Sequence, residues 1–187
     1  MAKQWIKSCP GFLIAVILAG CGSMGAQFAS IGEVSESEPQ ARLRVLGGGG
    51  FVRGVPDSNC LDWSKPGAGT IIGGLVGSSG FRGRSLDMPN PERREGKPFA
   101  EIHVAAGKPF ALAFMTGPEA RYSCALSGVL VLDEGQDYEA EARMSDEEVR
   151  VGLSFVPTCV LSLKRLTPEG TWEPQPIRQV LLCRRRK

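Results

Sequence analysis

The chain has 187 residues, of which 42% are hydrophobic and 22% are charged. This balance excludes an intrinsically disordered protein, which has less apolar content, and a polytopic membrane protein, which has more. The length suits a single domain. Lysine and arginine number 22 and aspartate and glutamate 20, so the net charge of +2 creates no large field that would attract nucleic acid.

The first 20 residues have the organisation of a secretory signal peptide. Lys3 and Lys7 form a positive start without any acidic residue, and an uncharged, mostly aliphatic run follows from Gly11 to Gly20. A membrane-spanning helix needs about 20 apolar residues. The run is about half that length, so we expect it to be the hydrophobic core of a cleaved signal peptide, residues 1–20, and not a permanent anchor.

The segment Leu18-Ala19-Gly20-Cys21 resembles the lipobox of bacterial lipoproteins. The resemblance implies cleavage before Cys21, attachment of a diacylglycerol to its thiol and of a further acyl chain to its amine. Apart from these covalent lipids, no cofactor is expected. Two or more acyl chains make a stable membrane anchor. Because Gly22 and Ser23 follow the cysteine where an aspartate would imply inner-membrane retention, the resemblance favours the outer membrane in an organism with two membranes.

Removal of Lys3 and Lys7 with the signal peptide would leave 20 basic and 20 acidic residues, so the mature chain is predicted to be neutral. Residues 21–40 are small, polar and mildly acidic, and we expect an acylated N-terminus and a flexible tether there. The folded domain is expected over 41–183. A basic tail, 184–187, could contact anionic lipid headgroups or be a terminus without a partner.

From residue 41 onward, short segments have an apolar residue at every second position. The segments are 43–45, 101–104, 110–114, 122–126, 138–142, 149–155 and 159–163, with glycine and proline between them. This alternation predicts an all-β fold, a small antiparallel β-sandwich of immunoglobulin-like or transthyretin-like type. It places Arg42 and Arg44 on the face opposite the core. The glycine-rich region 47–98 is expected to form inserted loops or irregular strands.

Cys9 lies in the signal peptide and Cys21 is the predicted lipid attachment site. Four other cysteines remain: Cys60, Cys124, Cys159 and Cys183. An even number in an oxidising compartment favours disulfides. Cys124 and Cys159 both fall on core-facing positions of their predicted strands. Of the three possible connectivities we therefore predict Cys124–Cys159 and Cys60–Cys183. No metal site is expected, because the chain has no CxxC pair.

No catalytic residue is predicted. His103 is the only histidine and would have to be the base of a hydrolytic triad, but the chain has no G-x-S-x-G motif. A surface histidine is the preferred interpretation, and a periplasmic hydrolase is kept as an alternative. The acidic stretch 133–148 is predicted to be a solvated face, since Asp137, Glu139 and Glu141 alternate with apolar residues; weak binding of a divalent cation is the alternative.

Gly69, Gly73 and Gly77 are spaced four apart and make two overlapping G-x-x-x-G units. On a helix they would form a smooth stripe similar to that of glycine-zipper envelope proteins, which would oligomerise or insert in the membrane through residues 67–80. The apolar centre of the segment is short, and glycine is a poor helix former. A loop or hairpin is therefore preferred, with the zipper as an alternative.

The region 59–84 is the predicted contact surface, because loops on a rigid sheet often carry recognition. Its candidate residues are Trp63, Gly69, Gly73, Gly77, Arg82 and Arg84. Together these features predict a membrane-anchored envelope lipoprotein that is a non-enzymatic accessory or binding module. Its expected partners are membrane lipid, through the anchor, and an envelope protein or a cell-wall component; no nucleic acid partner is expected.

Overall fold

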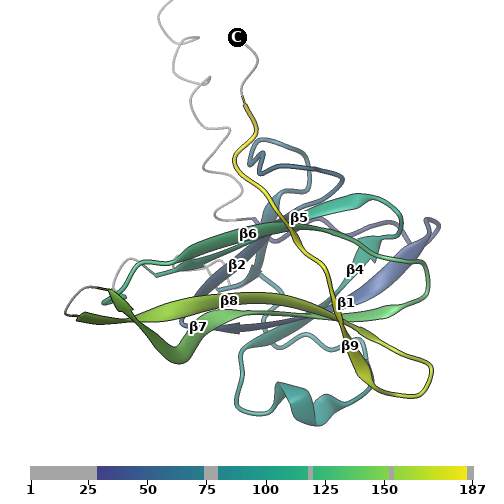
Figure 1. Ribbon diagram of the computed structural model, residues 1–187. Helices are drawn as coiled ribbons and strands as arrows, with labels where there is room; N and C mark the ends of the chain where they lie inside the picture. Colours follow the sequence, from purple (N-terminus) through teal and green to yellow (C-terminus); the bar gives the residue numbers. More distant parts are fainter. Residues whose placement is uncertain (1–28, 74–79, 118–119, 152–153, 185–187) are drawn as a thin grey trace, which may run out of the picture.

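The computed structural model describes residues 29–73, 80–117, 120–151 and 154–184 (Figure 1). Its strands are β1 (Gln40–Gly48), β2 (Gly50–Val55), β3 (Gly69–Ile72), β4 (Phe99–Ala105), β5 (Pro109–Thr116), β6 (Ala125–Val131), β7 (Asp137–Val151), β8 (Ser154–Leu166), β9 (Trp172–Gln175) and β10 (Arg178–Gln179). A short 3-10 helix, η2 (Pro91–Arg94), lies between β3 and β4. The predicted all-β class is confirmed.

The strands form two five-stranded sheets that pack face to face. The first sheet has the order β4-β1-β7-β8-β9 and the second has the order β10-β6-β5-β2-β3. Among the described residues, the pairings between these strands are antiparallel except that of β1 with β7, which is parallel. The predicted sandwich is therefore confirmed, but its first sheet is mixed and not purely antiparallel.

The core lies between the two sheets and is built by the predicted alternation. In the first sheet Leu43 and Val45 point inward from β1, while in the second sheet Leu112 and Phe114 point inward from β5. Each of these four side chains is fully buried. Burial of a large aliphatic or aromatic side chain contributes about 1.5–3 kcal/mol, so this shared apolar layer is the main force that holds the sheets together.

The glycine-rich region 47–98 contains regular structure between its loops. Gly49, at φ 74°, makes the tight turn from β1 in the first sheet to β2 in the second. β2 then pairs with β3 on one side and β5 on the other. The segment that contains η2, teal at the bottom of Figure 1, lies beside the first sheet.

The expected flexible tether over 21–40 is wrong for its last part. Ile31 is 3% exposed and belongs to the core, because its segment runs along β3. The Thr70 N–H donates to the Ala29 carbonyl, and the Ile31 N–H donates to the Thr70 carbonyl. The folded domain therefore begins by residue 29 and not at residue 41.

Both predicted disulfides are present. Cys124–Cys159 joins the segment before β6 to β8 and so ties the second sheet to the first. Cys60–Cys183 ties the loop after β2 to the C-terminal segment. In Figure 1 that segment, in yellow, passes from β9 in one sheet to β10 in the other. One bridge thus joins the two sheets, and the other holds the C-terminal segment to a loop of the second sheet.

Candidate functional site

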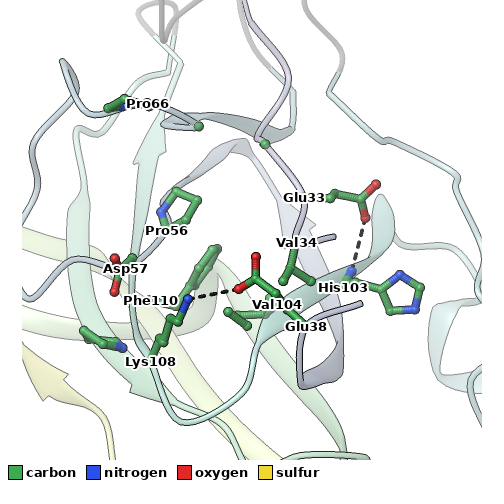
Figure 2. A pocket seen from close by; sticks show the side chains of 14 residues that line it. Glu33, Val34, Glu38, Pro56, Asp57, Pro66, His103, Val104, Lys108 and Phe110 are labelled. Atoms are coloured by element: carbon green, nitrogen blue, oxygen red, sulfur yellow. Dashed lines mark hydrogen bonds and ion pairs between the residues drawn. The ribbon is translucent and has the colours of Figure 1, made fainter. Parts of the chain in front are cut away.

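A cavity of about 200 Å³ opens between the N-terminal segment, the loops after β2 and the β4–β5 hairpin (Figure 2). Its apolar lining comes from Val34, Val104, Phe110 and three prolines, Pro56, Pro66 and Pro109. Phe110 is part of the main core, so the floor of the cavity is continuous with the interior. One wall of the cavity is formed by residues of the segment 32–38, which the sequence predicted to be part of a flexible tether.

Charged groups surround the cavity and pair with one another. Lys108 Nζ lies 3.0 Å from Glu38 Oε2, and this hydrogen bond raises the pKa of Lys108. Glu33 accepts the backbone N–H of His103 through Oε1 and pairs with Arg84 through Oε2. The His103 imidazole makes no hydrogen bond to any residue that the structure describes. The arrangement offers apolar volume with a charged rim.

A buried ion cluster covers the outer face of the first sheet, where solvated side chains were predicted. We use this name for Arg44, Arg93, Arg94, Glu101 and Glu139. Arg44 and Glu101 have no exposed side-chain surface and Glu139 has 1%. Arg44 pairs with both carboxylates, at 2.9 Å and 3.4 Å, while Arg93 and Arg94 approach from the covering segment.

The prediction that Asp137, Glu139 and Glu141 form a solvated face is therefore wrong for the first two. Asp137 is 9% exposed and pairs with Arg42, and Glu139 is buried in the ion cluster. Glu141 stays partly exposed beside Arg143 and Lys97. The physical reason is that residues 85–97 fold over this part of the sheet and exclude water from a face that local alternation marks as polar.

Backbone groups complete the cluster. Arg44 donates to the carbonyls of Met88, Pro89 and Asn90, so one guanidinium holds three consecutive residues of the covering segment. Burial alone raises the pKa of Glu101, but the N–H groups of Leu86 and Met88 and the Arg44 guanidinium outweigh it and hold that pKa below 4.5. All these groups satisfy one another, which favours a structural role for the cluster.

The predicted contact residues do not form one loop surface. Gly69 lies in β3, and Gly73, at φ 77°, ends that strand against Phe51. These two glycines therefore do not lie on the helical stripe that a zipper requires; Gly77 lies outside the described residues. Gly69 is needed because the backbone of Ser30 passes within 2.5 Å of the place where a Cβ would be.

The remaining predicted residues are separated in the structure. Arg84 belongs to the cavity rim through Glu33 and also lies over the Phe81 ring at 4.6 Å. Arg82 is exposed in the turn that follows β3. Trp63 packs on the outer face of the second sheet, beside a small apolar cluster that includes Val55 and Ala68. The lipidation site, Cys21, lies outside the described residues.

Sequence reasoning missed Arg53, which lies next to Trp63. Its side chain is buried although it comes from a short strand between glycines, and its guanidinium carbon is 4.7 Å from the Phe51 ring centroid and 6.0 Å from that of Trp63. Nothing local distinguishes it from Arg42 or Arg44. An aromatic residue two positions before it, Phe51, is the one signal that could have placed the two side chains on a common face.

Comparison with protein-family models, with curated proteins and with solved structures finds no match to this chain. Within the described ranges, no helix has the length and apolar content needed to cross a bilayer. Among those same residues, no group of three or more histidine, cysteine, aspartate or glutamate side chains is placed to hold a metal ion.

Proposed function

We propose that this chain is an envelope lipoprotein, anchored through acylated Cys21, whose β-sandwich is a non-enzymatic accessory or binding module. The two disulfides support the compartment, because disulfides form and persist in oxidising environments outside the cytosol. The lipobox-like segment ending at Cys21 supports the anchor. An outer-membrane location belongs to this proposal where the organism has two membranes.

The short connection between Cys21 and the domain supports a position close to the bilayer. Ala29 is hydrogen-bonded to β3, and it lies only eight positions after Cys21. An extended chain spans at most about 3.5 Å per residue, so the connection reaches about 28 Å at most. A tether that extended to residue 40 would have allowed more than twice that distance.

The observation that carries the binding role is the cavity of Figure 2. Its volume, about 200 Å³, is below the range of about 300–1,000 Å³ typical of pockets for whole small molecules. Apolar walls with a charged rim suit one or two apolar side chains of a protein partner, which insert as an anchor while polar groups pair around them. The charged groups on the rim are paired with one another, as in Lys108 and Glu38, and not with a nucleophile.

Metabolic labelling with palmitate tests the anchor. We expect label on the wild-type chain and none on Cys21→Ser, which should also fail to be processed and to sediment with membranes. The Cys9→Ser chain is the matched control, because it changes a cysteine that processing would discard. Labelling of Cys21→Ser at the wild-type level would overturn the anchoring proposal.

Site-specific photo-crosslinking in living cells tests the binding role. A photoreactive residue at Val34, in the cavity wall, should give a discrete adduct with an envelope protein, and one at Glu169, in the exposed β8–β9 turn, should not. Ala105→Trp, which places a large side chain in the cavity lining, should abolish the adduct. Equal adducts from both positions, or an adduct that persists with Ala105→Trp, would contradict the cavity as the binding site.

A further inference from the structure

We propose that Arg53, flanked by Phe51 and Trp63, binds the phosphate of an anionic lipid headgroup at the membrane surface. The proposal rests on the anchoring of the chain through Cys21. It adds a second, non-covalent contact between the domain and the bilayer, on the outer face of the second sheet and away from the cavity of Figure 2.

Arg53 is a cation without a counter-ion among the described residues. It is 6% exposed, and no ion pair or side-chain hydrogen bond joins it to any of them. Its Nε is buried without a hydrogen-bond partner, and so is Oγ1 of Thr70, the residue opposite Arg53 on β3. By contrast, Arg44, which is also withdrawn from solvent, meets two carboxylates.

The surroundings of Arg53 leave it able to take an anion. Phe51 and Trp63 contact the guanidinium through their rings, which favours a cation but neutralises no charge. Of the side-chain nitrogens of Arg53, Nε alone is both fully buried and unpartnered, so the small exposed part of the residue includes the two terminal nitrogens. Burial lowers the pKa of Arg53, and a bound anion would offset that cost.

The anion that suits Arg53 best is an oxyanion with two oxygens that can each accept an N–H of the guanidinium. A guanidinium presents parallel N–H groups in a rigid plane, and this fork matches phosphate and carboxylate geometry. The small neighbours of Arg53 in the sheet, Ala113 on β5 and Thr70 on β3, leave the end of the fork unobstructed by long side chains from the paired strands. The terminal nitrogens, which keep the exposed area of Arg53, are the atoms that a phosphate would contact.

The position of Arg53 favours a lipid phosphate over a partner's carboxylate. Thr70, its neighbour on β3, donates its N–H to the carbonyl of Ala29, the first described residue. Neighbouring strands are about 4.8 Å apart, so Arg53 lies about 10 Å from the point where the chain enters the domain. With about 28 Å at most between Ala29 and Cys21, the acyl anchor keeps Arg53 within reach of headgroups. Tryptophan and arginine are both favoured at such an interface.

Fluorescence of Trp63 in the acylated mature chain tests the proposal. The sequence has three tryptophans; Trp5 leaves with the signal peptide, and Trp172→Phe makes Trp63 the only one remaining. The chain is reconstituted in vesicles of phosphatidylcholine, with or without phosphatidylglycerol, that contain a headgroup spin label as quencher. We expect several-fold stronger quenching with phosphatidylglycerol, reduced by Arg53→Gln to the level seen in phosphatidylcholine and partly retained in Arg53→Lys.

Arg178→Gln is the matched control, because Arg178 is exposed on β10 of the same sheet. It should leave quenching unchanged. Equal quenching in both vesicle types, or no effect of Arg53→Gln in a chain that keeps both disulfides, would overturn the proposal. Loss of quenching with millimolar inorganic phosphate would assign Arg53 to a soluble anion and overturn the lipid assignment. A chain that floats with vesicles while Trp63 is never quenched overturns this inference alone, whereas a chain that does not float overturns the anchoring proposal as well.

Discussion

Arg44 and Glu101 lie directly opposite each other on the paired strands β1 and β4, and neither has any exposed side-chain surface. Arg44 Nε is 2.9 Å from Glu101 Oε1. On its other side Arg44 is in register with Glu139 of β7, so a guanidinium lies between two carboxylates in one row across three strands. This row fixes the segment 85–97 to the sheet, because the same groups also bind that segment's backbone.

Arg44→Met should be strongly destabilising. The variant keeps most of the apolar volume of the side chain but leaves Glu101 and Glu139 buried without their common partner. Breaking a buried ion pair in this way costs about 3–5 kcal/mol. Urea unfolding followed by circular dichroism measures the loss directly.

Arg42→Met is the control for that experiment. Arg42 is two residues away on the same strand and pairs with Asp137, but its side chain is 37% exposed. Because Arg42 is more than a third exposed, solvent screens its pair with Asp137, and its loss should cost less than the loss of the fully buried Arg44. Similar losses of stability for both variants would contradict a special role of the buried row.

The double variant Glu101→Gln with Arg44→Met should lose less free energy of unfolding than the sum of the two single variants, because the two residues interact.

A fall in pH should reduce the stability of the folded domain, because it protonates Glu101 in the row formed by Arg44, Glu101 and Glu139. The pKa of Glu101 is held below its ordinary value of 4.5 in the folded chain, so its carboxylate contributes stability at every pH above that value. This contribution is lost as the pH falls through the lower folded pKa. The free energy of unfolding should therefore decline below about pH 4.5, and Glu101→Gln should flatten that decline. An unchanged pH profile in Glu101→Gln would show that other carboxyls are responsible.

The sequence was sufficient for the parts of the fold that depend on neighbouring residues. Alternation placed Leu43 and Val45 toward the core, and the same parity placed Cys124 and Cys159 where they pair. The sequence was insufficient where a segment distant along the chain determines whether a side chain is exposed to water. Arg44 is on the predicted face, but water is excluded from that face by a segment more than 40 residues later, which local pattern cannot reveal.

The candidate sites show the same limit. Trp63 was predicted from the sequence as a contact residue, but its neighbour Arg53 was not. The residue type alone does not show whether an arginine side chain is buried or exposed. The cavity of Figure 2 draws on three segments, one of which was interpreted as a tether. Ile31 and Val34 are isolated apolar residues in a small, polar stretch and give no sustained periodicity.

Removal of each disulfide should destabilise the chain by different amounts. The bridges Cys124–Cys159 and Cys60–Cys183 close loops with sequence separations of 35 and 123 residues. In the chain-entropy model these correspond to about 4 and about 5 kcal/mol. Paired serine variants of each bridge, compared by thermal unfolding under non-reducing conditions, test this order. The wild-type chain under reducing conditions should approach the variant that lacks both bridges.

Gly69→Ala should release the N-terminal segment from β3. An added Cβ at residue 69 would lie 2.5 Å from the carbonyl oxygen of Ser30 and 2.7 Å from the nitrogen of Ile31, and backbone atoms cannot yield as a flexible side chain can. Overpacking of this kind costs about 1–3 kcal/mol. A glutamate-specific protease should therefore cleave the variant faster at Glu33, Glu36 or Glu38.

Gly47→Ala is the matched control, because a Cβ at residue 47 would meet only side-chain carbons of Ile72 and Val52 at 3.6 Å or more. That distance is an ordinary van der Waals contact, so stability and cleavage should remain at the wild-type level. If Gly69→Ala were cleaved no faster than Gly47→Ala, the segment from Ala29 would not depend on β3 for its position. The short reach between Cys21 and the domain, on which the proposed membrane contact of Arg53 depends, would then lose its structural basis.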